Sequence, residues 1–567
     1  MAAEKKHILF YFLLLILLLI AYVSGLFIDV TRDAAKYAYI AKEMALTNHW
    51  LDIRILDEPY EQKPHFMFWL SAISFKFFGI SNFAFKLPVF LFSLLGVYFT
   101  YRLGKTAYNK KTGITAAVII MFSMMFVLYN MDLHTDTPLF TFSALALWQL
   151  YEYLKFKRNK NLLLSAVALG FALLTKGPFG VMLPVLSVFG FLIHKRHWKK
   201  AFNPRWGLLI VLSFLIASPA LIHLYRNFGT EGISFFFFQN TYGRFTGEYM
   251  GHTPDPFFYV HNMAHLLLPW SLVFFGAIIL GARKIIKKNE TDVDRYLFRG
   301  IIIFFIIISI SLSKLPNYLM CAFPAIALLS AHYWHEAVEK NRLFRKLQTC
   351  LNYVLITASV VVIFHFLSGS KLIFVILPIF VTSLYIFLFR KTESEKKLYT
   401  LTLTSASIAA LSLNLVAVPM LFSHQAQPKV AKIANQMPEH IKIYNYPKSD
   451  LKYIRRLQQN HNLPEKHKFK QTPDPLHFSY NYELMFYTNK PVQYIETDKQ
   501  LETALKTPTA LFYTDFEGME IIRNSNAPVD TIYTFEHFSL KRTAKLLFPK
   551  KGESPFVDMY LVSINHK

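Results

Sequence analysis

Six charged residues stand where long apolar runs of this chain begin or end, and their types suit chemistry on a charged substrate. Carboxylates in such places can act as bases, orient a sugar or bind a metal ion. Cations that converge on a partly dry cleft form a good site for a phosphate or diphosphate. The Lys/Arg clusters lie at the opposite ends of the runs, so these six residues are predicted to share the outer face of a membrane. They are Asp33, Lys63, Asp136, Lys176, Arg244 and Lys314.

Asp33 and Asp136 are the candidate catalytic residues. Asp33 follows the first apolar run in the pattern Asp33-x-x-Lys36-Tyr37, and Asp136 opens a later run. Either carboxylate could instead be a helix N-cap, which is worth about 1 kcal/mol. Two aspartates at similar depth in separate external loops favour a functional role over capping. We therefore predict that both face one external cavity.

The external cations are predicted to bind phosphate. Lys63 lies in a short polar segment, and Lys176 joins two apolar runs with almost no loop. Each lysine alone could merely extend its ammonium group to lipid headgroups. The orientation rule does not favour bases at external span ends, however, so the group of cations needs another reason. The predicted phosphate site comprises Lys63, Lys176, Arg244 and Lys314, with Tyr318 as a hydrogen-bond donor.

A metal site is an alternative use of two further residues. Glu61 and His252 could together hold a divalent metal ion, although a single histidine is more often a hydrogen-bonded interfacial residue. The chain has two cysteines, Cys321 and Cys350, and no C-x-x-C or Cys/His zinc spacing. We therefore expect no required cofactor, with Glu61 and His252 as the candidate metal ligands.

The composition is typical of a membrane protein. Of the 567 residues, 53% are hydrophobic and 17% are charged, whereas about a quarter of a soluble chain is charged. The mean hydropathy is +0.30. The formal net charge of +25 comes from short basic clusters between apolar runs. Such clusters set orientation and contact anionic lipids, so we expect membrane lipids and no nucleic acid as partners.

About thirteen apolar runs approach the 20 or so residues that a membrane-spanning helix needs. Alternate loops between them carry the Lys/Arg clusters that mark the cytoplasm. An odd number of spans puts the N-terminus in the cytoplasm and the C-terminus outside. The predicted spans are residues 8–28, 86–104, 113–131, 136–154, 161–175, 178–194, 207–225, 259–282, 297–313, 317–335, 350–367, 371–389 and 399–421.

This topology predicts an α-helical polytopic membrane protein with a C-terminal α/β domain outside the cytoplasm. Residues 1–421 form the transmembrane domain, and residues 422–567 form the external domain. Residues 29–85 are the first external loop of the transmembrane domain, with juxtamembrane helices at 33–46 and after Pro64. The expected strands are His440–Tyr446, Pro491–Ile495, Ala510–Thr514, Thr531–Phe538 and Val557–Ile564, with a short helix capped by Asp498.

Several motifs together resemble the GT-C class of polyprenyl-phosphate-sugar glycosyltransferases. Within that class the chain is most similar to the bacterial transferases that add 4-amino-4-deoxy-L-arabinose to lipid A, and more broadly to protein O-mannosyltransferases. The motifs are Asp33-x-x-Lys36-Tyr37, Tyr60-x-x-Lys63-Pro64, Thr175-Lys176-Gly177, Arg244-Phe245, His252, Leu268-Pro269-Trp270 and Lys314-Leu315-Pro316-x-Tyr318.

The resemblance implies an enzyme at the periplasmic face of a bacterial inner membrane. Its donor would be a sugar on a polyprenyl phosphate such as undecaprenyl phosphate, and its acceptor lipid A or another periplasmic molecule. Lys36 and Tyr37 of the first motif would contact the substrate. Three positions depart from the family pattern. Gln62 precedes Lys63 where the family often has Glu, Ala34 replaces the Glu after Asp33, and Lys36 replaces the usual Arg.

Three other functions stay open from the sequence. An enzyme like the protein O-mannosyltransferases would use a Ser or Thr hydroxyl as acceptor instead of lipid A. A transporter of lipids or lipid-linked sugars would place ionisable groups near the membrane midplane, whereas the middles of these runs carry almost no charge. A structural scaffold gives no reason for external cations and aspartates. Sugar transfer from a polyprenyl phosphate donor distinguishes an enzyme from both non-enzymes.

Overall fold

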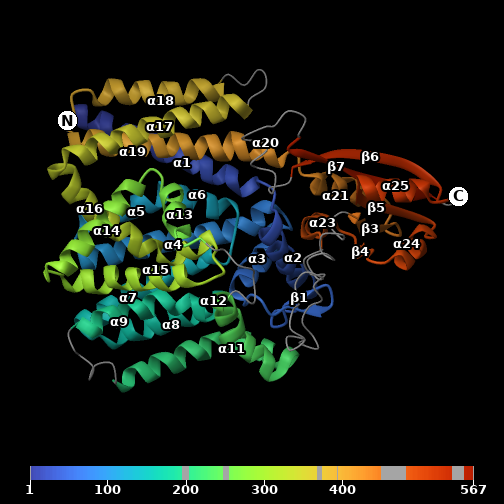
Figure 1. Ribbon diagram of the computed structural model, residues 1–567, viewed down its shortest axis with the longest axis horizontal. Helices are drawn as coiled ribbons and strands as arrows, with labels where there is room; N and C mark the ends of the chain where they lie inside the picture. The colour runs from blue at the N-terminus through green and yellow to red at the C-terminus, as the bar shows by residue number, and fades with distance from the viewer. Residues whose placement is uncertain are drawn as a thin grey trace. The chain divides into compact units, whose positions relative to one another are not determined.

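The chain is divided into two compact units by its internal contacts. The computed structural model describes residues 2–194, 203–246, 255–366, 373–392, 394–448, 480–538 and 554–565. The first unit comprises Met1–Phe27, Met44–Ile53 and Pro59–Ala417, and the second comprises Ile28–Glu43, Arg54–Glu58 and Val418–Lys567. The first unit is helical, and the second contains a five-stranded sheet (Figure 1).

The first unit is a bundle of helices with many apolar side chains on its surface. Figure 1 draws α17, α18 and α19 side by side, and contacts join α19 to both neighbours. Phe364 of α17 and Phe380 of α18 are among the large apolar side chains that stay exposed, as a lipid environment requires. The helices are α1 (Ala2–Phe27), α3 (Phe66–Phe78), α4 (Asn82–Ala107), α5 (Lys110–Met121), α6 (Met124–Met131), α7 (Asp136–Phe156), α8 (Asn159–Lys176), η1 (Gly177–Val181), α9 (Met182–His194), α11 (Pro204–Ser234), η2 (Phe235–Gly243), α12 (Arg244–Thr246), α13 (Phe258–Leu266), α14 (Ser271–Ile286), η3 (Asp294–Phe298), α15 (Arg299–Ile310), η4 (Pro316–Ala322), α16 (Phe323–Lys340), α17 (Arg342–Phe366), α18 (Ile373–Phe389), α19 (Ser394–Leu411) and η5 (Ser412–Ala417).

Six helices within the described residues are long and apolar enough to cross a membrane, or seven if the bent pair α5–α6 counts as one span. The chain is therefore a multi-pass membrane protein, as predicted. The expected thirteen spans are not reached by this criterion, because several of the runs form short helices. Helix α14 has 16 residues, α15 has 12 and α18 has 17. The full number of spans stays a prediction.

Helix α7 is buried along most of its length and packs against α4, α8, α9 and η4. A glycine allows one close approach, because a Cβ at Gly96 of α4 would lie 2.4 Å from the Phe140 ring of α7. On another side, the Ser143 hydroxyl donates a 2.6 Å hydrogen bond to the Cys321 carbonyl of η4. These contacts fix the position of Asp136, the first residue of α7, relative to η4.

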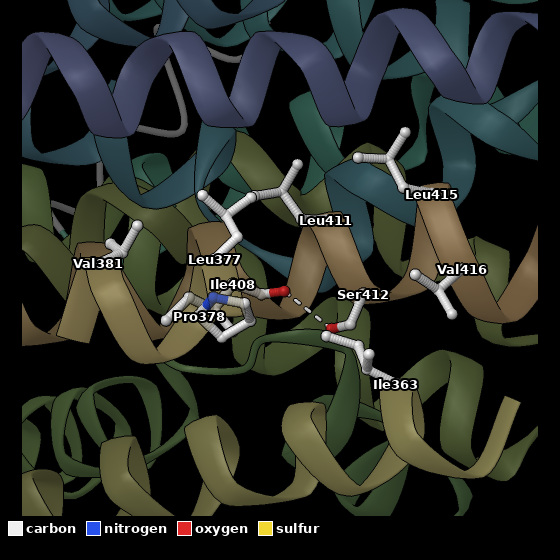
Figure 2. Close-up of a pocket in the computed structure, with 9 residues that line it drawn as sticks. All are labelled: Ile363, Leu377, Pro378, Val381, Ile408, Leu411, Ser412, Leu415 and Val416. Carbon is white, nitrogen blue, oxygen red and sulfur yellow. Dashed lines mark hydrogen bonds between the residues drawn. The ribbon is translucent and has the colours of Figure 1, made fainter. Parts of the chain in front are cut away.

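A small apolar cavity lies among α17, α18 and α19 with η5 (Figure 2). Ile363 of α17, Pro378 of α18 and Leu411 of α19 are among its nine lining residues. The Ser412 hydroxyl is the one polar side-chain group among these nine, and it donates a 2.8 Å hydrogen bond to the Ile408 carbonyl. No lining side chain is charged, so this cavity offers nothing that could bind an anion or move a proton.

Five strands of the second unit form one mixed sheet in the order β4-β3-β5-β7-β6. Strand β3 pairs parallel with β4 and β5, and β7 pairs antiparallel with β5 and β6. The five predicted strands of the C-terminal α/β region are thereby confirmed. The strands are β3 (Lys442–Tyr446), β4 (Val492–Tyr494), β5 (Thr509–Asp515), β6 (Val529–Phe538) and β7 (Phe556–Asn565), and the helices are α20 (Val418–Phe422), α21 (Ala426–Gln436), α23 (Tyr482–Tyr487), α24 (Asp498–Leu505) and α25 (Phe516–Asn524).

The cap predicted for α24 is wrong by one residue. Thr497, not Asp498, is the N-cap of this helix. The Thr497 side chain accepts a hydrogen bond from the Gln500 N–H, and the Gln500 side chain accepts one from the Thr497 N–H. This capping box satisfies two N–H groups at once, which a cap at Asp498 would not do.

Part of the segment predicted as the first external loop belongs to the second unit. Most of α2 (Arg32–Thr47) and the short strands β1 (Arg54–Ile55) and β2 (Glu58–Pro59) lie there. The sequence predicted that all of 29–85 would join the transmembrane domain, but the structure divides this loop between the units. The physical reason is the buried ammonium of Lys42, which donates hydrogen bonds to the carbonyls of Met485 (2.9 Å), Phe486 (3.1 Å) and Thr488 (2.5 Å). Burial lowers the pKa of Lys42 to about 8, which still leaves the group charged at neutral pH.

Candidate functional site

The buried carboxylate of Asp136 is held through both of its oxygens. Asp136 begins α7 with its side chain 1% exposed, and Lys176 ends α8 with its side chain 6% exposed. The Lys176 ammonium forms a salt bridge with Oδ1 of Asp136. The side-chain amide of Asn317 donates a 2.6 Å hydrogen bond to Oδ2. A buried ion pair needs such additional hydrogen bonds, because removing two charges from water is costly.

Two aromatic rings complete the surroundings of Lys176. Its Nζ lies 4.8 Å from the centre of the Phe179 ring and 4.5 Å from the centre of the Tyr318 ring. A cation at such distances is attracted to the ring face. Gly177 directly follows α8 as its C-cap with φ +65°, a conformation in which other residues are strained. The Lys-Gly pair of the motif therefore places the ammonium where the helix stops.

Lys63, Lys176 and Tyr318 come together in one cavity of the first unit. The structure thus brings three of the predicted residues together, and their role as a phosphate site stays a prediction. The cavity encloses about 590 Å³ that no protein atom fills, its open mouth included. The remaining lining residues are Phe179, Met182, Asn240, Phe245, Ile307, Ile308 and Ser311. Two cations in a mostly apolar wall suit a ligand with an anionic head and an apolar body.

The other two predicted cations lie close to this cavity in the chain. Lys314 is buried, 7% exposed, four residues before Tyr318, and is not one of the lining residues. Arg244 begins α12, and the next residue, Phe245, lines the cavity. The Leu312 N–H donates a 3.0 Å hydrogen bond to the Phe245 carbonyl, which joins α12 to the segment before η4. A phosphate-binding role for Lys314 and Arg244 stays a prediction.

The residues of the first motif lie on α2, in the second unit. Asp33 stands in the first turn of this helix, and its 54% exposed carboxylate pairs with Lys36 at 3.1 Å. Tyr37 is buried. The cavity predicted to be shared by Asp33 and Asp136 stays a prediction.

The candidate metal ligands are not brought together by any described contact. Glu61 is half-buried, and His252 lies outside the described residues. In the part of the chain that the structure describes, no three His, Cys, Asp or Glu side chains are placed to hold a metal ion. A metal site at Glu61 and His252 stays a prediction.

The motifs do not identify three candidate functional residues, which are Asn317, Asn240 and Ser311. Asn317 fills the unspecified position between Pro316 and Tyr318 of the last motif. Its bond to Asp136 joins residues 181 positions apart, and it forms only because η4 packs against α7. The one signal for Asn317 in the sequence was a polar residue inside a motif whose neighbouring residues are otherwise apolar.

The helical bundle, the mixed C-terminal sheet and the charged cavity define a multi-pass membrane protein with the fold of ArnT. The crystal structure of ArnT from Cupriavidus metallidurans bound to undecaprenyl phosphate aligns with a TM-score of 0.72. The alignment covers 98% of this chain and 97% of that chain. The two sequences are 16% identical, so this match concerns the fold alone.

Sequence comparison finds related glycosyltransferases. Residues 62–223 match the model of the dolichyl-phosphate-mannose-protein mannosyltransferase family. The undecaprenyl phosphate-alpha-4-amino-4-deoxy-L-arabinose arabinosyl transferase of Edwardsiella ictaluri is 26% identical over 54% of this chain and 56% of its own length. The corresponding transferase of Wigglesworthia glossinidia brevipalpis is 28% identical over 57% and 58%. The chain thus spans little more than half the length of these curated relatives. Residues 62–223 are thus similar to this family of GT-C glycosyltransferases, and the resemblance predicted from the motifs is confirmed.

Breaking the buried pair is expected to destabilise the protein. Asp136→Asn leaves the Lys176 ammonium buried without its counter-charge, which costs about 3–5 kcal/mol. Adding Lys176→Met to this variant should recover most of the lost stability, because no buried charge then lacks a partner. Thermal unfolding of the purified full-length protein measures both effects.

The exposed pair Lys111–Glu395 is the control for this experiment. Its atoms are 3.4 Å apart, and the side chains are 64% and 32% exposed. Lys111→Met should change the stability by less than about 1 kcal/mol. Equal losses for Asp136→Asn and Lys111→Met would contradict the structural importance of the buried pair.

Proposed function

We propose that the protein is a membrane glycosyltransferase that moves a sugar from a polyprenyl phosphate, such as undecaprenyl phosphate, to an acceptor at the periplasmic face of the inner membrane. One observation carries the proposal: Lys63 and Lys176 line one cavity whose wall is otherwise mostly apolar. A polyprenyl phosphate has the complementary chemistry, an anionic head on an apolar chain. The solved ArnT structure that shares this fold holds undecaprenyl phosphate.

The reaction needs charge stabilisation more than it needs a cofactor. The bond between the sugar's anomeric carbon and the phosphate oxygen breaks, and its electron pair stays on the polyprenyl phosphate. An acceptor oxygen forms the new bond to the same carbon. Negative charge therefore grows on the leaving phosphate, and the ammonium groups of Lys63 and Lys176 stabilise it most in the transition state.

The two aspartates are assigned different roles. Both oxygens of Asp136 are already bound, by Lys176 and by Asn317. Asp136 therefore acts as a positioning residue that orients the Lys176 ammonium. The carboxylate of Asp33 is half-exposed, so it is the better candidate to accept a proton or to bind a sugar group.

Lipid A is the proposed acceptor. The relatives named above are aminoarabinose transferases, and the structural match to ArnT extends over nearly the whole chain. A lipid A phosphate is ionised at neutral pH and attacks without losing a proton to the enzyme. The Lys/Arg pattern supports a cytoplasmic N-terminus and a periplasmic C-terminus for the same arrangement.

Protein O-mannosylation is the second candidate function. The match of residues 62–223 to the dolichyl-phosphate-mannose-protein mannosyltransferase model favours it. Its acceptor would be a Ser or Thr hydroxyl, which must lose a proton as it attacks. That proton would need a base such as Asp33.

Asp33→Asn should lower turnover by about a hundredfold, because an amide can neither accept a proton nor carry the charge that orients a cationic sugar group. Turnover is measured with purified protein and a labelled polyprenyl-phosphate sugar. Asp57→Asn is the control, since Asp57 is an exposed acid of the same loop. Near-normal turnover of the Asp33 variant would reduce this residue to a helix cap.

Lys63→Ala should raise the KM for the lipid-linked donor by about tenfold or more, because a charged phosphate contact is worth about 1.5–3 kcal/mol. The KM for the acceptor should stay unchanged. Lys76→Ala, at an exposed lysine of α3, is expected to leave both values near those of the wild type. A donor KM that is the same in both variants would remove Lys63 from the phosphate site.

Deletion of the gene should lower the mass of lipid A by the transferred sugar, because the modified phosphate is lost. Mass spectrometry of lipid A and of secreted proteins from the same strains measures this. Unchanged lipid A together with loss of hexose from secreted proteins would establish protein O-mannosylation instead. If purified protein transfers no sugar from any polyprenyl phosphate donor, the proposed enzyme function itself fails.

A further inference from the structure

The segment that carries Lys63 has no regular secondary structure of its own, yet its backbone is held at three points. It lies between β2 and α3. The Tyr60 N–H donates a 2.9 Å hydrogen bond to the Ile53 carbonyl. The Tyr60 carbonyl accepts one from Nε2 of His223 at 2.9 Å, and the Gln62 carbonyl accepts one from the Asn240 amide at 3.4 Å. Residues outside the segment therefore determine the position of Lys63.

His223 is the buried member of these partners. It lies on α11 and is 2% exposed. Because a carbonyl oxygen can only accept, Nε2 of His223 must carry the proton in its bond to Tyr60. On the other side of the ring, Nδ1 lies 3.5 Å from Oδ1 of Asp52 and 3.1 Å from Nδ2 of Asn227. The Asn227 amide also contacts Oδ1 of Asp52 at 3.3 Å, so these two side chains together fix the orientation of the ring.

A second histidine stabilises the same region without adding charge. The ring of His65 lies 5.4 Å from that of His223, edge to face, and is fully buried. Its Nε2 donates a 2.9 Å hydrogen bond to the Leu51 carbonyl. Burial lowers the pKa of His65 to about 4, so the ring is neutral at physiological pH. Residues 51–53 and 60–65 are thus held against α11 by two imidazole rings.

We infer that His223, oriented by Asp52 and Asn227, is a positioning residue that holds the Tyr60–Lys63 backbone and so places the Lys63 ammonium at the cavity. The inference rests on the proposed function, because it assumes that Lys63 binds the donor phosphate. His223 is not one of the residues that line the cavity. Its whole effect on the ligand should therefore pass through Lys63.

Binding of undecaprenyl phosphate to the full-length protein in nanodiscs tests the inference. His223→Leu removes the donor to Tyr60 and should raise the Kd about tenfold. His223→Gln should restore binding to within about threefold of the wild type, because its amide nitrogen can reach the position of Nε2. His223→Asn, whose shorter amide cannot reach that position, should behave like His223→Leu. Ser213→Ala is the control, since Ser213 is a buried, hydrogen-bonded residue elsewhere on α11.

A double-mutant cycle separates positioning from general damage to the fold. In a Lys63→Ala background, His223→Leu should change the Kd by less than about twofold, because the group that it positions is gone. An unchanged Kd for His223→Leu, or an equal effect with and without Lys63, would overturn the inference. If His223→Leu does not fold, the comparison of His223→Gln with His223→Asn decides, and equal Kd values for these two overturn it.

The same protein samples distinguish failure of this inference from failure of the proposed function. If the wild type binds undecaprenyl phosphate and Lys63→Ala weakens binding, the phosphate site stands whatever the His223 variants do. If neither Lys63→Ala nor the His223 variants change binding, the phosphate site and the inference fail together. Sugar transfer by the wild type, measured in parallel, tests the enzyme function independently of both.

Discussion

The ion pair between Asp136 and Lys176 is the interaction on which the cavity depends. Its two residues stand at adjoining ends of α7 and α8, where burial would make either charge alone very costly. The pair therefore keeps these helix ends together, and Asn317 of η4 joins it through the second carboxylate oxygen. Three elements are thus held at one place, and the ammonium is left facing the rings of Phe179 and Tyr318.

The apolar surroundings give these few polar contacts more weight than they would have in water. Groups inside a membrane protein cannot exchange a lost partner for solvent, so each polar side chain needs an internal acceptor or donor. The Ser143–Cys321 hydrogen bond between α7 and η4 and the Ser412–Ile408 bond between η5 and α19 both meet this need. The contrast between the two cavities follows the same rule. The cavity with Lys63 and Lys176 contains charged groups, and Lys176 is paired with Asp136. The cavity of Figure 2 has one hydroxyl, which donates a hydrogen bond to the Ile408 carbonyl.

Sequence reasoning succeeded where a signal is local and failed where it depends on packing. Strand-like stretches predicted the C-terminal strands. The motifs placed Lys63, Lys176 and Tyr318 in one predicted site, and these three residues line one cavity. The partner of Asp136 could not be predicted, because Asn317 reaches it only through the fold.

The sequence could not predict, for the same reason, that the first predicted external loop is divided between the two units. A lysine in an amphipathic helix is normally expected to face solvent. Lys42 is instead buried and bonded to carbonyls more than 440 positions away in the chain. Apolar runs also do not reveal where a helix breaks, as happens between α5 and α6, which meet at a bend of 50°.

The packing of η4 against α7 has a practical consequence for the two thiols of the chain. Cys321, whose carbonyl accepts the hydrogen bond from Ser143, is 1% exposed, whereas Cys350 on α17 is exposed. A membrane-permeant maleimide therefore modifies Cys350 in the folded protein and reaches Cys321 only after η4 separates from α7. The ratio of the two adducts therefore reports whether η4 is still packed against α7 behind the cavity. Measuring it requires no engineered label.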